Sequence, residues 1–479
     1  TDAIDQLYAG SLTGMSNNGS ASEMGRASYV GRLNYSYKDK YLLESSLRAD
    51  ASAKFPANER WGYFPSISLG WRLTEENFMK GIANLDELKL RASYGTSGDD
   101  GVGNFQYLTG YQIASNGVTG LSYLFGSDGS VPALLSKGLA NPNLTWEKIK
   151  IYNAGFEFSL WKGKLYGTGD VFYREETGIP ATAITTLPAS FGATLPPQNL
   201  NSLNNRGFEL ELGTSGRYGD LVWNVSGNIS WSRSKWMHYE EPDYDNDPQQ
   251  KRISQKSGRW TDEVYGYLTD GLFTSQKEID DLGFNQDGNT AAPNSSLRPG
   301  DLRYKDMVPD SILNWQDQWL IGKGATPHWM FGFNTSLKYK DFDLSALFQG
   351  AFGYYKDINV SLGSVYTTVL YNERWTEENN NPNALVPRLG GKGAGFSDYR
   401  YKKAGYLRLK TFSLGYNLPQ RWAEAAKLAQ ARLYVAGTNL LTFDKLKKYG
   451  LDPEAPSGMS GSFYYPQQRT ISVGASVSF

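Results

Sequence analysis

The sequence lacks cysteine altogether and contains only two histidines, His238 and His328, among its 479 residues. Disulfides, thiolate nucleophiles and cysteine-based metal sites are therefore excluded. The chain also carries no G-x-S-x-G, H-E-x-x-H, G-x-G-x-x-G or P-loop motif, so the common catalytic and nucleotide-binding sites are missing. We therefore expect a protein that is not an enzyme and that has no cofactor.

Long hydrophobic runs are missing too, because no stretch approaches the roughly 18 apolar residues of a transmembrane helix. Mean hydropathy is -0.50, so a chain of this kind could cross a bilayer only as a closed β-barrel. There is no excess of one charge, since 48 basic residues stand against 49 acidic ones. That balance gives no reason to expect nucleic acid or anionic lipid as a partner. The start TDAIDQ has no Met and no signal sequence, so we expect an earlier segment to have been removed.

Aromatic residues, by contrast, are abundant at 14%, and the last residues alternate strictly. In QRTISVGASVSF, every second side chain from Ile471 to the terminal Phe479 is apolar, and the residues between them are small or polar. A strand with one oily and one wet face that ends on an aromatic residue is typical of the final strand of an outer-membrane β-barrel. Residues 221–232 show the same period, which by itself also fits a soluble β-sandwich.

The placement of Trp and Tyr favours the membrane barrel over the sandwich. Trp223 and Trp231 frame one apolar strand face, and Trp329 and Tyr339 frame another. Amphipathic rings at both ends of an aliphatic span match the two interfacial girdles of a membrane barrel. We therefore predict that these four residues lie at the membrane interfaces, in contact with outer-membrane lipid.

Membrane barrels alternate tight periplasmic turns with long outer loops. We predict tight turns at 37–41, 161–164, 217–221 and 339–342, and short helical returns at 74–87 and 419–430. The long connections then fall at 98–146, 177–205, 235–327, 355–403 and 442–467. Residues 105–113 and 264–273 resemble strands, but counting either as a spanning strand would break the alternation, so both are assigned to outer loops. About 13 spanning strands result, and because bacterial barrels have even counts we expect the remaining strands in an earlier part of the protein.

Several stretches resemble the C-terminal half of the SusC/RagA family of TonB-dependent outer-membrane transporters, in the family order and over nearly the whole chain. They are SYVGRLNYSYKDKYLLESSLRADASAKF (28–55), WGYFPSISLGWRLTEENFM (61–79), LKLRASYGTSGDDGVGNFQY (88–107), residues 141–175, NRGFELELG (205–213), PGDLRYKDM (299–307), YKDFDLSALFQGAFG (339–353), LRLKTFSLGYNLP (407–419) and Phe479.

The resemblance implies an all-β protein, a 22-stranded transmembrane antiparallel barrel with an N-terminal plug, an energy-coupling box that engages TonB, and a SusD-like surface lipoprotein as a lid. The plug and the box are not in this sequence. Residues 1–26 would be a loop or linker end, and residues 27–479 the C-terminal part of the barrel. The chain departs from the family at Pro309, Asp310 and Ser311, where relatives carry an Asn-Gly-Asp-Gly type turn, so an ion in that loop is in doubt.

Aromatic and Arg side chains in the predicted outer loops are the candidate substrate contacts, because flat rings stack on sugars and grip peptides. The alternative is that they pack the loops together or meet the lid. Arg388 and Arg400 could likewise be loop pins or substrate contacts. The candidates are Trp260, Trp315, Trp375, Tyr371, Arg374, Tyr399 and Tyr464.

Asp301, Asp306 and Asp310, with Asp317, could offer oxygen ligands to Ca²⁺, although their spacing does not match the EF-hand. Solvated turn carboxylates are the alternative. For His328, beside Trp329, a loop or interfacial histidine is the alternative to a ligand or switch. The adjacent pair Glu240 and Glu241 lies in a polar segment and is not expected to be a glycosidase pair.

Together these observations predict a SusC-like importer in the outer membrane of a Gram-negative cell that captures an oligosaccharide with its SusD-like lid. An oligopeptide importer of the same family is the second hypothesis. A soluble secreted lectin or adhesin and a secreted glycosidase are rivals of other classes. The lectin predicts no sorting of Trp and Tyr to strand ends, and the glycosidase predicts an essential acid pair.

Overall fold

A computed structural model describes most of the chain. The described residues are 23–113, 122–124, 130–132, 134–136, 138–185, 187–191, 193, 195–358, 368–391, 396–455 and 467–479. Among them no helix is long and apolar enough to cross a membrane.

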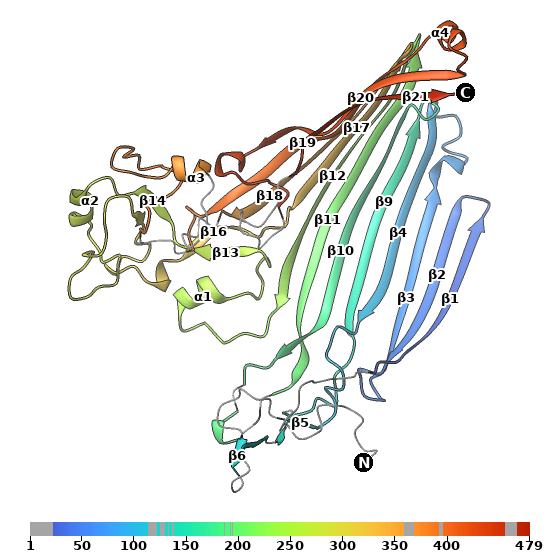
Figure 1. Ribbon diagram of the computed structural model, residues 1–479. Helices are drawn as coiled ribbons and strands as arrows, with labels where there is room; N and C mark the ends of the chain where they lie inside the picture. The colour runs from blue at the N-terminus through green and yellow to red at the C-terminus, as the bar shows by residue number, and fades with distance from the viewer. Residues whose placement is uncertain are drawn as a thin grey trace.

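One continuous antiparallel sheet of 13 strands forms the wall of the molecule, curved as a single layer (Figure 1). Neighbouring strands follow one another along the chain, as expected for an up-and-down barrel wall. The predicted number of spanning strands is therefore confirmed. In order across the sheet they are β1 (Arg26–Tyr37), β2 (Tyr41–Ser52), β3 (Trp61–Arg72), β4 (Leu85–Asp99), β9 (Glu147–Leu160), β10 (Leu165–Thr182), β11 (Pro197–Tyr218), β12 (Leu221–His238), β17 (Trp329–Tyr339), β18 (Phe342–Asp357), β19 (Tyr401–Asn417), β20 (Gln430–Asp444) and β21 (Thr470–Ser478).

Short connections gather at one end of the sheet, as the alternation predicted. Lys38 and Asp39 have φ of 53° and 54°, the left-handed conformation of a tight hairpin turn whose twist matches the strands. Of the two predicted helical returns, residues 419–430 contain the helix α4 (Gln420–Ala425), whereas residues 74–87 contain only the 3₁₀ turn η2 (Leu73–Glu75) and further turns. This end carries α4 and the C-terminus in Figure 1.

Long connections leave from the opposite end of the sheet. They join β4 to β9, β10 to β11, β12 to β17, β18 to β19 and β20 to β21, as predicted. A sixth connection at this end, residues 53–60 between β2 and β3, is short and was not among the predicted long loops. It is closed by Phe55, which is fully buried against Trp146 with ring centroids 5.3 Å apart.

The two strand-like segments assigned to loops lie outside the wall, which confirms that assignment. Residues 264–273 form β13 (Glu263–Gly266) and β14 (Thr269–Leu272), which pair with β16 (Trp319–Lys323) and β15 (Leu302–Tyr304) in separate two-stranded sheets. Residues 105–113 contribute only β5 (Tyr111–Ile113), paired with β8 (Leu134–Ser136). The small pair β6 (Ser122–Leu124) and β7 (Ser130–Pro132) lies in the same connection.

The connections from β12 to β17 and from β18 to β19 fold together into what we call the loop body, residues 239–328, 368–391 and 396–400. Its helical turns are α1 (Pro248–Ser254), α2 (Gln276–Asp280), α3 (Thr368–Asn372) and the 3₁₀ turn η4 (Trp315–Asp317). The 3₁₀ turns η3 (Ala189–Phe191) and η5 (Lys447–Tyr449) lie in other connections. Figure 1 shows the loop body projecting from the end of the sheet that carries the long connections.

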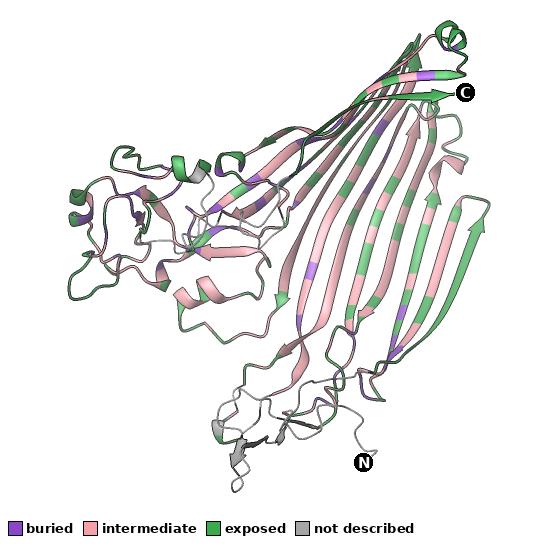
Figure 2. Ribbon diagram, in the orientation of Figure 1, coloured by how far each residue is buried: buried purple, intermediate pink, exposed green. Residues whose placement is uncertain are grey.

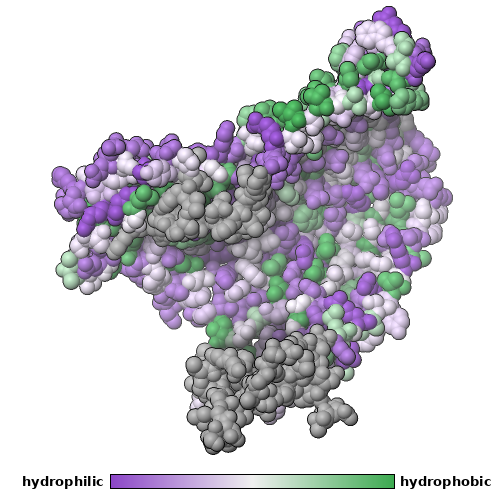
Figure 3. Space-filling model, viewed as in Figure 1, coloured by the Kyte–Doolittle hydropathy of each residue, from purple (hydrophilic) through white to green (hydrophobic). Residues whose placement is uncertain are grey.

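The wall has one apolar and one polar face, set by strand parity. On β12 the apolar set includes Trp223, Ile229 and Trp231, each of which is only half-buried. Figure 2 shows the wall as a single layer of strands. The opposite set, with Asn228 and Ser230, lines a hollow on the concave face. Figure 3 looks onto this concave face, where hydrophilic residues predominate. We call the apolar side the outward face and the concave side the lumen face.

Candidate functional site

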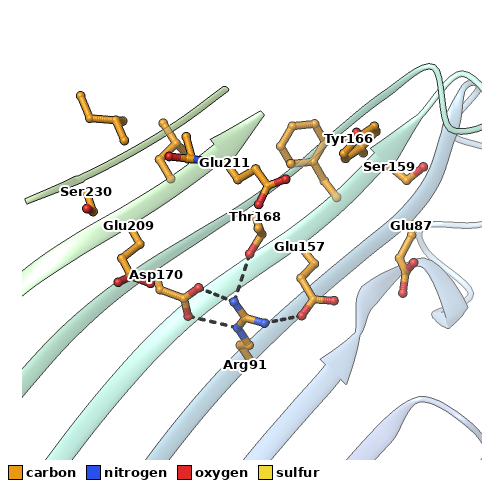
Figure 4. Close-up of a pocket in the computed structure, with 15 residues that line it drawn as sticks. Glu87, Arg91, Glu157, Ser159, Tyr166, Thr168, Asp170, Glu209, Glu211 and Ser230 are labelled. Atoms are coloured by element: carbon orange, nitrogen blue, oxygen red, sulfur yellow. Dashed lines mark hydrogen bonds and ion pairs between the residues drawn. The ribbon is translucent and has the colours of Figure 1, made fainter. Parts of the chain in front are cut away.

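A pocket of about 680 Å³ lies on the lumen face of the wall. Strand parity places every second side chain of β4, β9, β10, β11 and β12 there. The residues labelled in Figure 4 are Glu87, Arg91, Glu157, Ser159, Tyr166, Thr168, Asp170, Glu209, Glu211 and Ser230.

Arg91 is the hub of this pocket. Its guanidinium donates to Asp170 at 3.1 Å and to the Thr168 hydroxyl at 3.0 Å, and it also pairs with Glu157 (Figure 4). A planar fork of donors suits carboxylates on two neighbouring strands at once. Glu209 and Glu211 have no hydrogen bond or ion pair with another side chain in the described part of the chain, so they leave acidic oxygens open to the lumen.

A second cation, Arg408, fixes a loop against the lumen face. Its side chain is only 3% exposed and donates to both oxygens of Asp452 at 3.0 Å, and it also pairs with Glu454. The Tyr354 hydroxyl donates to the Pro453 carbonyl at 2.9 Å. The connection between β20 and β21 is therefore folded back onto β18 and β19.

Two of the predicted substrate contacts are buried. Trp375 and Tyr399, at 5% and 9% exposure, belong to the apolar cluster of the loop body with Leu272, Leu302 and Tyr304. Trp375 donates from Nε1 to Asn380 at 3.0 Å, and Tyr399 donates to the Ala384 carbonyl. Burial raises the pKa of Tyr399. These contacts fit the alternative in which the two side chains pack the loops together.

Three other predicted contacts are accessible on the loop body. Trp315 is 41% exposed and Tyr371 is 48% exposed. The guanidinium of Arg374 lies 3.8 Å from the centroid of the Tyr371 ring, within cation–π range, and donates to the Tyr371 carbonyl. Tyr464 lies outside the described residues.

Trp260 has a different environment from the other loop aromatics. Its ring lies between two guanidinium groups, 4.9 Å from that of Arg206 and 4.3 Å from that of Arg233. Both arginines are on the outward face, one pleat beyond Phe208 and Trp231. Trp260 therefore contacts the outer side of the wall, away from the lumen pocket.

Asp301, Asp310 and Asp317 of the predicted Ca²⁺ loop have hydrogen-bond partners in the protein, whereas Oδ1 of Asp306 is buried without one among the described residues. Asp301 is fully buried and accepts from Arg388 at 2.7 Å, which makes Arg388 a loop pin. Asp317, also buried, accepts three backbone N–H groups, and Asp310 accepts from Ile312 and Asn314. Burial, with Asp317 nearby, raises the pKa of Asp306. No group of three or more potential metal ligands is found among the described residues.

The remaining predicted loop residues are tied by ion pairs. His328 pairs with Asp262, which also accepts from Arg233 at 2.9 Å. Arg400 pairs with Asp357 through two hydrogen bonds of 2.5 and 2.6 Å. These contacts pin the loop body to the end of the wall.

The predicted girdle residues occupy two levels of the outward face. At the level of the long connections, Trp231 and Trp329 lie 6.3 Å apart, and Phe352 stacks on Trp329 at 5.4 Å. Tyr339, opposite Leu221, lies at the other end, and Trp223 is two residues further along β12. Phe479 follows the last strand directly and is 94% exposed.

Arg91 and Arg408 were missed from the sequence. Arg91 lies in LKLRASY and Arg408 in LRLKTF. In each segment the charged side chain faces away from the apolar side chains of the strand. That pattern could have marked them as lumen residues. Their partners, 66 to 79 residues away for Arg91 and 44 to 46 away for Arg408, become visible only once the strands are ordered.

Known proteins agree with this architecture. The family model described as "TonB dependent receptor-like, beta-barrel" matches residues 2–440. The TonB-dependent receptor SusC of Bacteroides thetaiotaomicron is 29% identical over 449 residues, 92% of this chain and 42% of that protein. The TonB-dependent receptor P3 of Formosa agariphila is 28% identical over 468 residues, 92% of this chain and 44% of that protein. The chain thus spans less than half the length of these relatives.

Solved structures share the fold. The RagAB peptide importer in its closed-closed state matches with a TM-score of 0.70 at 23% identity, over 96% of this chain and 48% of that one. Its open-open state matches with a TM-score of 0.71 at 22% identity, over 98% and 49%. The match to the receptor-barrel family model and to SusC contradicts the rival hypotheses of a soluble lectin and a secreted glycosidase. The chain belongs to the TonB dependent receptor-like, beta-barrel family and forms part of a SusC/RagA-like outer-membrane barrel.

Proposed function

We propose that this chain forms the C-terminal wall and the outer loops of an importer that takes up oligomeric nutrients across the outer membrane, with energy supplied through TonB. One observation carries the proposal: a single-layered wall with an apolar outward face and a charged lumen face, in a chain 29% identical to SusC over 92% of its length. The plug, the remaining strands and the TonB contact would come from the rest of the protein.

The lumen face would provide a hydrated path for the substrate. The carboxylates of Glu209 and Glu211 and the ion pairs of Arg91 make this surface hydrophilic. The loop body would form the outer mouth, where a SusD-like lipoprotein would close over the substrate. The resemblance to SusC supports that partner, and plug movement driven by TonB would open the path.

Oligosaccharide is the substrate class that we propose first. Trp315 and Tyr371 expose their rings, and Arg374 beside Tyr371 adds hydrogen-bond donors. Rings next to polar groups can stack on sugar faces and satisfy hydroxyls. Trp375 and Tyr399 would support these residues from the buried cluster and would not touch the substrate.

Oligopeptide is the second candidate, and the open acidic oxygens of the lumen favour it. Glu209 and Glu211 would attract cationic side chains but would be indifferent to a neutral glycan. The RagAB importer, whose structures carry the same fold, is described as a peptide importer.

Uptake by cells that express the full-length protein tests the proposal. Labelled neutral oligosaccharides and labelled oligopeptides would be supplied with and without functional TonB. We expect TonB-dependent uptake of oligosaccharides, and uptake of peptides alone would replace the first substrate class with the second. Absence of TonB-dependent uptake of either class, with the protein present in the outer membrane, would contradict the importer.

Variants of the exposed rings locate the binding surface. Trp315→Ala and Tyr371→Ala should each weaken substrate binding about fivefold, since a lost stacking contact is worth about 1 kcal/mol. Tyr218→Ala is the matched control, because Tyr218 is 83% exposed at the end with the short turns. Equal affinity in the two loop variants and the control would remove these rings from the binding surface.

A further inference from the structure

The outward face carries no charge over the centre of the wall. From the end with the short turns up to the level of Trp231 and Trp329, its positions on five central strands are all uncharged. These positions are 152, 154, 156, 158 and 160 on β9, 165–173 (odd) on β10, 208–214 (even) on β11, 221–231 (odd) on β12 and 329–339 (odd) on β17. A charge-free band of this kind is the part of a barrel that contacts hydrocarbon.

Directly beyond this band the outward positions become basic. The next ones on β9, β11 and β12, nearer the long connections, supply five cations. Among the described residues, two carboxylates pair with them, Glu175 of β10 and Asp262 of the loop body. We call the five the basic patch: Lys148, Lys150, Arg206, Arg233 and Lys235. The chain as a whole is almost neutral, so its net charge does not reveal this cluster.

Three cations of the basic patch, Lys148, Arg206 and Lys235, form no ion pair among the described residues. Arg233 is committed to Asp262 at 2.9 Å, and Lys150 lies 3.7 Å from Glu175. Arg206 contacts the Trp260 ring and, like Lys235, forms no ion pair with any side chain in the described ranges. Because Arg206 lies opposite Arg233 and Lys235 opposite Asn204, the two are diagonal neighbours, roughly 7–8 Å apart. Both can reach one phosphate group.

Trp260 holds this arrangement in place. Its segment runs beside β12 as an extra edge strand, with Thr261 N–H donating to Ser234 at 3.0 Å and Trp236 N–H donating to Arg259 at 2.8 Å. The ring is therefore fixed, and the guanidinium of Arg206 stacks on it. A guanidinium positioned before binding loses less freedom when it binds an anion.

We propose that the basic patch is a docking site for the phosphorylated headgroup of a lipid in the outer leaflet, with Arg206 and Lys235 as the phosphate contacts. The acyl chains would lie along the charge-free band beneath it. Three features fit this ligand: the cations are on the lipid side of the wall, they begin where the apolar band ends, and an aromatic row containing Trp231 marks the boundary.

Lipid binding by the purified full-length protein tests this site. The protein, in a neutral detergent, would be titrated with lipid A bearing its phosphates, with dephosphorylated lipid A and with inorganic phosphate, and binding followed by native mass spectrometry. We expect phosphorylated lipid A to bind and R206Q/K235Q to weaken it about 30-fold, since each cation near a charged surface contributes about 1 kcal/mol. Affinity should also fall as salt is raised.

R174Q is the matched control. Arg174 is on β10 opposite Asn205, at the same level of the wall but on the lumen face, so the variant removes one charge without touching the basic patch. It should bind lipid A as the unaltered protein does. R206K/K235R keeps both charges and should retain most of the affinity.

Four outcomes would overturn the proposal. They are equal lipid binding by R206Q/K235Q and the unaltered protein, equal binding of phosphorylated and dephosphorylated lipid, affinity independent of salt, and saturable binding of inorganic phosphate alone, which would indicate a solute site. If R206Q/K235Q fails to assemble, as judged by its heat-modifiable mobility on gels, K235Q alone and the salt titration decide the question.

Discussion

The wall and the loop body bury their apolar side chains in opposite ways. On the wall, Leu212 is 45% exposed and Val473 is 82% exposed, because the layer that covers them is lipid. In the loop body, Leu272 is 1% exposed and Val386 is fully buried, as in a small water-soluble domain. One chain therefore follows two rules of packing, and the solvent around each part decides which rule applies.

The ion pairs of the two regions also differ in their exposure to solvent. The Arg91 cluster of the wall is partly open to the lumen, with Arg91 and Glu157 both 32% exposed. In the loop body, Asp301 is fully buried against Arg388. A buried ion pair costs much when one partner is lost, whereas an open cluster is screened by water. Four experiments can break or sharpen this comparison.

The largest effect is expected for Asp301→Asn. Removing the charge leaves the Arg388 guanidinium without its partner and should destabilise the loop body by about 3 kcal/mol. Amide hydrogen exchange in the loop body of the full-length protein should speed up accordingly, while the heat-modifiable mobility of the barrel stays unchanged. Asp270→Asn is the control, because Asp270 is 55% exposed beside Arg303 and its loss should cost less than about 1 kcal/mol. Loss of the barrel itself in Asp301→Asn would show that the two regions are not independent.

The next effect concerns the two faces of the wall. Ile229→Arg places a charge on the outward face and should cost about 2–4 kcal/mol at mid-bilayer depth, which would reduce assembled protein in outer-membrane fractions. Ser230→Arg, one residue further on, faces the lumen pocket and should assemble normally. The reverse result would mean that the two faces have been assigned the wrong way round.

A pH effect is expected at Asp287 of the loop body. Burial opposes ionisation of Asp287, but hydrogen bonds from the Ser296 hydroxyl and from the backbone of Asn289, Ser296 and Asn294 lower its pKa to about 2. A lowered folded-state pKa stabilises the loop body above about pH 4, and this contribution, up to about 2 kcal/mol, is lost as the pH falls toward 2. Acid proteolysis should therefore cut residues 284–296 first. Asp287→Asn should remove that pH dependence, and a variant as acid-sensitive as the unaltered protein would contradict the assignment.

The smallest effect is expected within the outer aromatic row. Trp329 and Phe352 stack with an interplanar angle of 9°, and such pairs contribute about 0.5–1.5 kcal/mol beyond their burial. A double-mutant cycle with Trp329→Leu and Phe352→Leu, followed by unfolding in lipid vesicles, should return a coupling energy in that range. A coupling energy of zero would mean that stacking between these rings does not stabilise the barrel, and that the row acts only through its contacts with lipid.

Much of the wall could be predicted because its physics is local. Alternation in residues 221–232 and 470–479 fixes strand and face together, since the side-chain period of a strand is two. Turn parity then excluded residues 105–113 and 264–273 from the wall, which propensity alone would have included. The short connection at residues 53–60 was missed, because its closure depends on Phe55 meeting Trp146 some 90 residues away.

The loop residues were the least predictable part. Trp375 and Trp315 have similar polar neighbours in sequence, yet one is buried and the other is 41% exposed. The sequence predicts Trp260 as a substrate contact, but the paired strands bring Arg206 and Arg233 to its two sides on the outward face. For Trp260 these contacts join segments 27 to 54 residues apart, which no local pattern contains.

By itself, the sequence determined that this chain is a wall of amphipathic strands with its short turns at one end, because backbone pairing and the two-residue period leave few alternatives. Only the tertiary structure decided which charges meet, which loop rings stay exposed and where the unpaired cations gather. The reason is physical. Strand register makes neighbours of residues that are far apart in the chain, and both burial and ion pairing depend on which residues become neighbours.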